Sequence, residues 1–141
     1  MTPYTVIYEA FLSKILEDEW GNWTEEEVKA DLRLILEGAI PWFKFPRVSL
    51  ERDEEGFKAI LGSEEIQILA AYMKCEWLNR TILTWENVKP LYEERDFSQA
   101  NLLDKFNQLL VKEEKKALSL ERIYYRSVKG KPFDYSRLAG A

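Results

Sequence analysis

The sequence predicts a mainly α-helical fold: a small bundle of four to five helices with a β-hairpin insertion, a long C-terminal helix and an extended tail. Three observations support this prediction. Apolar residues recur at three- and four-residue steps over most of the chain, which is the helical period. One segment, at about 42–61, changes to alternation. Residues 96–126 read as a single long helix. We therefore expect a helical body over 1–95, the long helix over 96–126 and an extended arm over 127–141.

The first helix is predicted from about Pro3 to Glu19, with Thr2 as its N-cap and Pro3 at its first position. Gly21 and Asn22 are expected to end it. Its apolar residues fall on one face: Tyr4, Ile7, Tyr8, Phe11, Leu12, Ile15 and Leu16.

A capping box predicts the start of the second helix. The Thr24 side chain can accept a hydrogen bond from the backbone of Glu27, and the Glu27 side chain can reach back to Thr24. Gly38 and Pro41 are expected to end this helix. Its apolar stripe consists of Val28, Leu32, Ile35 and Leu36.

The segment at 42–61 is a candidate β-hairpin. Residues 42–50 alternate between apolar and polar side chains, residues 52–56 have the composition of a turn, and 57–61 return to an apolar pattern. Pro46 places the first strand at an edge or a bulge, because proline cannot donate to a strand ladder.

A third helix is expected from Ser63 or Glu64 to Leu83, with Ser63 as its cap. Its apolar face is broad, so we expect it to be the central helix of the bundle. Thr84 is expected to cap a short helix that continues to about Lys89 and is disturbed by Pro90.

The long helix over 96–126 has two candidate caps, Asp96 with Gln99 three residues later, or Ser98. At ~1.5 Å per residue it spans roughly 43 Å, as long as the body it packs on. The charged residues 112–116 interrupt its apolar stripe. We expect its first half, Leu102 to Leu110, to pack on the body, and its second half, beyond Lys116, to be presented to a partner.

The C-terminal end carries a basic and aromatic cluster in an otherwise acidic protein. Three readings of this cluster stay open: a tail folded back on its own body, an arm that docks on a neighbouring subunit or a second protein, and a contact with nucleic acid. The candidate interface residues are Tyr124, Tyr125, Arg126, Lys131, Phe133, Tyr135 and Arg137.

Composition limits the partners. The net charge is -5, which argues against wrapping nucleic acid through phosphate contacts but suits the lining of a passage through which DNA slides. A single cysteine, Cys75, makes no intrachain disulfide and is expected to be a small buried residue. We expect no membrane segment and no secretory signal.

No catalytic chemistry is predicted. The chain has no histidine, which removes the commonest general base and most zinc sites. No phosphate-binding glycine loop occurs, so we expect no cofactor and no metal. The acidic runs at 17–19, 25–27 and 53–55 are consecutive, so their side chains diverge instead of converging on a metal. The five tryptophans are expected in the core or at an interface rather than as a stacking platform: Trp20, Trp23, Trp42, Trp77 and Trp85.

Several segments together resemble one family. They are the N-terminal helix from Thr2 to Trp20, the interrupted helical middle from Ile66 to Leu83, the opening 96–101 of the long helix (Asp-Phe-Ser-Gln-Ala-Asn), and Tyr-Tyr-Arg at 124–126 followed by a short tail. This layout resembles the head–tail connector proteins of tailed bacteriophages, also called adaptor or head-completion proteins. The candidate hairpin departs from the simplest all-helical version of that layout.

The resemblance implies a structural virion protein without catalytic residues. It would be made in the host cytoplasm and located at the neck of the virion. Its copies would form a ring, commonly of about twelve, between the portal protein and the next head-completion or tail protein. DNA would pass through without sequence-specific contact.

Two alternatives belong to other classes. The first is a regulatory binding module without enzymatic activity that acts on a single host or phage protein. The second is a metal-dependent enzyme built on carboxylates, which would need acidic side chains from different elements to converge.

Overall fold

The chain is mainly helical, as predicted. A computed structural model describes residues 1–15, 21, 23–88, 96–128 and 131–132. Four helices dominate it: α1 (Tyr4–Leu12), α2 (Glu25–Ala39), α3 (Ser63–Val88) and α4 (Asp96–Arg126). A short 3-10 helix, η1 (Ile40–Trp42), follows α2 directly.

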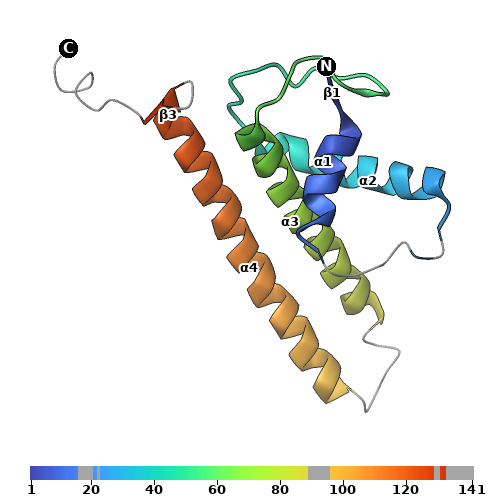
Figure 1. Cartoon of the computed structure of the whole chain (residues 1–141). Coiled ribbons are helices and arrows are strands. Elements are labelled where there is room, and N and C mark those ends of the chain that lie inside the picture. Colours follow the sequence, from blue (N-terminus) through green and yellow to red (C-terminus); the bar gives the residue numbers. More distant parts are fainter. Residues whose placement is uncertain (16–20, 22, 89–95, 129–130, 133–141) are drawn as a thin grey trace.

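Helix α3 is the centre of the molecule, as its apolar sequence predicted. It contacts α1, α2 and α4, and Figure 1 shows α4 running antiparallel along it, on the side away from α1 and α2. Its most deeply buried residues include Ile68, Leu69, Met73 and Leu78. A helix covered on several sides is expected to be apolar nearly all round, which explains why no narrow stripe is visible in its sequence.

The N-terminus pairs with the segment that was expected to form a hairpin. Strand β1 (Thr2–Pro3) runs antiparallel to β2 (Gly56–Phe57). Thr2 therefore does not cap α1. Its hydroxyl donates to the carbonyl of Ala59 at 3.0 Å and accepts from the amide of Leu61 at 2.8 Å. Pro3 takes the N-cap position of α1 in an extended conformation.

A small antiparallel sheet is present, but not between the two segments predicted. Trp42 ends η1, and residues 43–50 form no strand. An isolated bridge joins Arg52 to Phe57 around a tight turn. The Asp53 carboxylate accepts from the amides of Glu55 at 2.8 Å and Gly56 at 3.1 Å, as in the Asx-turns that aspartate favours. The turn was correctly located; the partner strand was the distant N-terminus.

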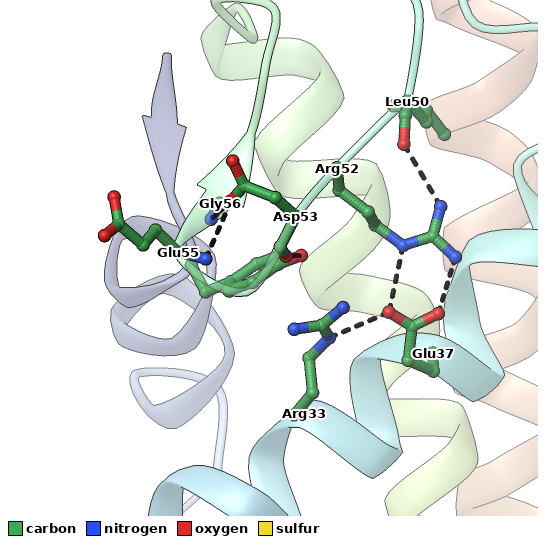
Figure 2. Close-up of polar contacts among 8 residues, drawn as sticks. Arg33, Glu37, Leu50, Arg52, Asp53, Glu55 and Gly56 are labelled. Atoms are coloured by element: carbon green, nitrogen blue, oxygen red, sulfur yellow. Dashed lines mark hydrogen bonds and ion pairs between the residues drawn. The ribbon is translucent and has the colours of Figure 1, made fainter.

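An arginine–glutamate network fixes this turn on α2 (Figure 2). The Arg52 Nε donates to Glu37 Oε1 at 2.9 Å, and its Nη2 forms an ion pair with Glu37 Oε2 at 2.5 Å. Arg33 donates to the same carboxylate at 2.8 Å. Arg33 also lies over the ring of Tyr4, 4.2 Å from its centroid. Arg33 and Arg52 thus both bind the Glu37 carboxylate, and together these contacts hold the turn and α1 against α2.

Two predicted helix ends differ from the structure. Helix α1 ends at Leu12, before the predicted Glu19; residues 16–20 and Asn22 lie outside the described residues. Helix α3 continues to Val88, so the prediction of a separate helix starting at Thr84 is wrong. The Thr84 hydroxyl donates to the Arg80 carbonyl at 2.9 Å, which satisfies it within the helix. Pro90 lies outside the described residues, as do the side chains of the candidate caps of α4.

The Thr24 cap is confirmed. The Glu27 amide donates to Thr24 Oγ1 at 3.2 Å, and α2 begins directly afterwards. Its first turn carries three glutamates, which interact favourably with the positive end of the helix dipole.

Helix α4 packs on α3 over the part whose side chains are described, from Leu103 to Tyr124. Leu103, Phe106 and Leu110 are half-buried, whereas Glu113, Ala117 and Tyr124 are buried. These residues follow three- and four-residue steps, the spacing of a helix pair packed side by side. The second half therefore also packs on the body, which the predicted division of the helix did not include; that its outer face is presented to a partner stays a prediction.

The charge run does not interrupt the packing of α4. Glu113 is 8% exposed, and its Oε1 pairs with Lys74 Nζ on α3 at 3.2 Å and with Lys116 Nζ at 3.5 Å. The neighbouring charges face outward. At this level of the helix pair, a buried ion pair takes the place of an apolar contact. A prediction from hydrophobic periodicity alone therefore missed that the helix is packed here.

Beyond α4, strand β3 (Ser127–Val128) pairs antiparallel with β4 (Lys131–Pro132). The described residues of this part have the extended conformation that was predicted. Residues 129–130 and 133–141 lie outside the described residues.

Candidate interaction surface

The predicted interface residues separate into three groups. Tyr124 is buried within its own chain, while Tyr125 and Arg126 are exposed at the end of α4. Lys131 lies in β4. Phe133, Tyr135 and Arg137 lie outside the described residues, so their role stays a prediction.

Tyr124 joins three parts of the fold. Its hydroxyl donates to Glu65 Oε2 on α3 at 2.8 Å and accepts from the Arg47 amide at 2.7 Å. The Arg47 guanidinium lies 3.8 Å from the centroid of the Tyr124 ring and donates to the Tyr124 carbonyl at 3.1 Å. Burial raises the pKa of the Tyr124 hydroxyl, which keeps it a donor. This tyrosine therefore fixes α4 and the loop at 43–50 relative to α3.

Tyr125 makes a second, shallower set of contacts. Its hydroxyl donates to the buried Glu121 and accepts from the Phe45 amide at 3.3 Å. Its ring packs edge-on against Phe45, with centroids 6.0 Å apart. Burial, followed by the hydrogen bond to Glu121, raises the pKa of Tyr125 to about 12. The outer edge of the Tyr125 ring stays accessible to solvent.

An apolar surface runs along one flank of α4. Val111, Leu118 and Tyr125 are spaced seven residues apart, so they lie on the same face of the helix. Val111 is 51% exposed and Leu118 is 47% exposed. Trp42 and Phe45, from η1 and the loop after it, are 54% and 71% exposed. We call these five residues the apolar stripe.

A groove lies beside the stripe, between α3, α4 and η1. Its volume is about 220 Å³. The ring of Trp42 stacks on Tyr72 at its rim, with centroids 6.3 Å apart, and the Trp42 Nε1 donates to Glu76 Oε1 at 2.9 Å. We call it the acidic groove; its lining residues are Trp42, Tyr72, Cys75, Glu76, Asn79, Leu110, Glu114 and Leu118.

Two carboxylates line the groove, those of Glu76 and Glu114. Burial, followed by the carboxylates of Glu114, Glu113 and Glu76, raises the pKa of the Cys75 thiol to about 12. A thiol with so high a pKa stays protonated at neutral pH and is a poor nucleophile. Cys75 therefore lines the groove as a small, unreactive buried residue, in agreement with the prediction. The carboxylates give the groove its charge.

Sequence reasoning did not find the stripe. Trp42 and Phe45 were assigned to a strand, Val111 was not singled out, and Leu118 was placed in the half of the helix beyond Lys116, without being joined to Trp42 and Phe45. The seven-residue spacing of Val111, Leu118 and Tyr125 was the available signal. Among the five tryptophans, which were expected in the core or at an interface, Trp77 is buried and Trp42 is exposed, so these two do not form one stacking platform.

The described residues contain no group of three or more acidic or cysteine side chains that could hold a metal ion. None of the helices in the described part of the chain has the length and apolar character needed to cross a bilayer. Comparisons with known protein families, with curated proteins and with solved structures each found no match to this chain.

Proposed function

We propose that this chain is a structural interaction protein, and specifically a head–tail connector subunit of a tailed bacteriophage. In this role it forms a ring that joins the portal protein to the tail and lines the DNA passage. The observation that carries the proposal is the apolar stripe on α4 and η1. Five large apolar side chains that share one surface of a small protein are typical of a protein–protein interface.

The stripe has the composition of an interface centre. Trp42, Phe45 and Tyr125 belong to the aromatic residues that dominate binding energy, and each is held by contacts to its own chain. Side chains that are already ordered lose little conformational entropy when a partner binds. The stripe is therefore preorganised for a protein partner.

The orientation of α4 is fixed by polar contacts that have little freedom. The Lys74–Glu113 pair and the Tyr124–Glu65 hydrogen bond are both shielded from water. Polar groups of this kind tolerate only one register, because a shift would leave each of them unpaired. A helix held in one register presents its outer face reproducibly, as a subunit of a ring requires.

The charge of the chain supports the second part of the proposal. Its net charge of -5 gives weak repulsion toward DNA phosphates, so a passage lined by such subunits would let DNA slide without adhering.

The test is assembly. Negative-stain electron microscopy of the full chain, alone and mixed with the portal protein encoded in the same genome, should reveal a ring on one face of the portal. The stripe variant Leu118→Glu should not form it. A matched variant, Leu34→Glu, alters a leucine on α2 that is 71% exposed and should assemble normally.

Two results would count against the connector role. A protein that stays monomeric or dimeric and captures one defined partner would indicate the regulatory module instead. A genome that encodes no virion protein near this chain would remove the connector role altogether.

A further inference from the structure

The acidic groove and the C-terminal arm have complementary chemistry. The arm, 127–141, contains Lys129, Lys131 and Arg137 against one acid, Asp134. The other 126 residues contain 17 Lys and Arg against 24 Asp and Glu. The chain is therefore electrically divided, with a positive arm at one end of α4 and an acidic body before it.

The groove holds negative charge that its own contacts do not neutralise. Glu76 accepts a hydrogen bond from a neutral indole, which leaves its charge in place. Within the described residues, Glu114 takes part in no ion pair, whereas its neighbour Glu113 is paired twice. A cationic group that entered the groove would find carboxylates on two of its walls.

The apolar part of the groove suits an aromatic ring. Leu110, Leu118 and Trp42 line it, and its volume of about 220 Å³ is below the range of ~300–1,000 Å³ that is usual for sites enclosing a whole small molecule. It has room for one or two side chains. The arm offers Phe133 and Tyr135 between its basic residues.

An arm cannot place Phe133 against Leu110 of its own chain. Pro132 pairs with Ser127 at the end of α4, and Phe133 follows directly. Leu118 lies nine residues before Ser127, which is roughly 13 Å along the helix, and Glu114 lies roughly 20 Å away. One extended residue spans only ~3.5 Å. Leu110, seventeen residues before Ser127 and roughly 25 Å away along the helix, is out of reach of Phe133 of the same chain, so a contact between Phe133 and Leu110 requires a second copy.

We propose that the acidic groove is the docking site for segment 133–137 of a neighbouring copy, with Phe133 against Leu110 and Leu118 and Arg137 near Glu114. This contact joins two different surfaces, so it is head-to-tail and closes into a ring when the rotation between copies permits. The inference rests on the proposed function and specifies which parts of adjacent subunits meet.

Photo-cross-linking tests this contact. Benzoylphenylalanine replaces Phe133 in the full chain, and equal amounts of ¹⁵N-labelled and unlabelled protein are mixed, irradiated and digested. Mass spectrometry should find adducts on peptides that contain residues 110–118 or 72–79, with one labelled and one unlabelled partner. The same probe at the exposed Ile60 should give no adduct in the groove.

Two variants of the groove sharpen the test. Glu114→Gln keeps the shape of the groove and removes one charge, so the yield of mixed adducts should fall several-fold. Glu25→Gln changes a carboxylate on α2 whose side chain is 82% exposed and should leave the yield unchanged. Adducts confined to one isotope, or located outside the groove, would overturn the proposal.

The failures of the two proposals can be told apart. A ring that forms on the portal without groove adducts refutes arm docking and keeps the connector role. Mixed groove adducts from a protein that forms only dimers keep arm docking and refute the connector role.

Discussion

Tyr124 shows how one side chain can determine the place of a whole helix. Its ring lies under the Arg47 guanidinium, and its hydroxyl both donates to Glu65 and accepts from the backbone of the 43–50 loop. Glu65 in turn accepts from the amide of Gly62 at 2.7 Å, just before α3 begins. Loss of this tyrosine's hydroxyl would remove one hydrogen bond from α3 and one from the 43–50 loop.

We predict that Tyr124→Phe lowers the free energy of unfolding by about 1–3 kcal/mol, because Glu65 loses a buried hydrogen bond and the Arg47 amide loses a partly buried one. Urea denaturation followed by circular dichroism measures the change. Ile123→Ala, one residue away and exposed, should change it by no more than ~0.5 kcal/mol. Equal effects of the two substitutions would contradict the role given to the hydroxyl.

Glu37 should give the protein an acid-sensitive component of stability. Hydrogen bonds from Arg52 and Arg33 lower the pKa of its carboxyl from 4.5 to about 2. The folded protein thus binds this proton less readily than the unfolded chain does. The stabilisation is fully present above pH about 4.5 and is lost as the pH falls toward 2.

In Glu37→Gln this proton linkage is absent. The variant should be less stable than the parent at pH 7, and the difference between them should shrink as the pH is lowered from 4.5 to 2. Urea denaturation at a series of pH values measures this difference. Glu54→Gln, at an exposed residue of the turn, serves as the control and should follow the parent curve. A difference for Glu37→Gln that is constant with pH would show that the two arginines do not hold the carboxylate.

At the scale of elements, the helices were the predictable part. Thr24 at the start of α2 and the apolar period of α1 are local signals, and both correspond to observed helices. The strand partner of Gly56–Phe57 was not predictable in this way, because it lies more than fifty residues away. Pairing over such a distance depends on how the helices bring the N-terminus to the turn.

The packing of the second half of α4 was not predicted, for a different reason. Its second half packs on α3 through Glu113, Ala117, Glu121 and Tyr124, of which two are charged and one is small. A hydrophobic stripe is the usual sign of a packed face, and here polar pairs replaced it. The exposed Val111 and Leu118, which the same rule would bury, belong to the apolar stripe.

Gly56→Ala tests the pairing of β1 with β2. A Cβ atom at this position would overlap the Thr2 carbonyl oxygen and lie 2.8 Å from the Pro3 Cα. Both are backbone atoms, so the N-terminal strand would have to move. We expect a loss of about 2 kcal/mol or more in the free energy of unfolding, measured by urea denaturation.

Gly38→Ala is the matched control for that substitution. The nearest atoms to its Cβ belong to the end of the Glu76 side chain, the closest at 3.0 Å. A flexible side chain can shift, and alanine favours the helix by roughly 1 kcal/mol over glycine. A larger loss at Gly38 than at Gly56 would contradict the observed register of β1 and β2.

At the scale of the whole molecule, one end of the long helix carries a basic arm and its flank carries an apolar stripe beside an acidic groove. The basic and aromatic composition of the arm was evident from the sequence. The groove was not, because Cys75 and Glu76 on α3, Glu114 and Leu118 on α4 and Trp42 on η1 come together only when the three elements pack.

The central claim is that the apolar stripe joins copies of this chain into an assembly. Sedimentation velocity of the full chain with its portal protein tests it most directly, by comparing the parent with Leu118→Glu and Leu34→Glu. We predict that the parent and Leu34→Glu sediment as a multi-subunit complex on the portal, and that Leu118→Glu stays a folded, free monomer. Equal incorporation of all three proteins, or of none, would contradict the claim.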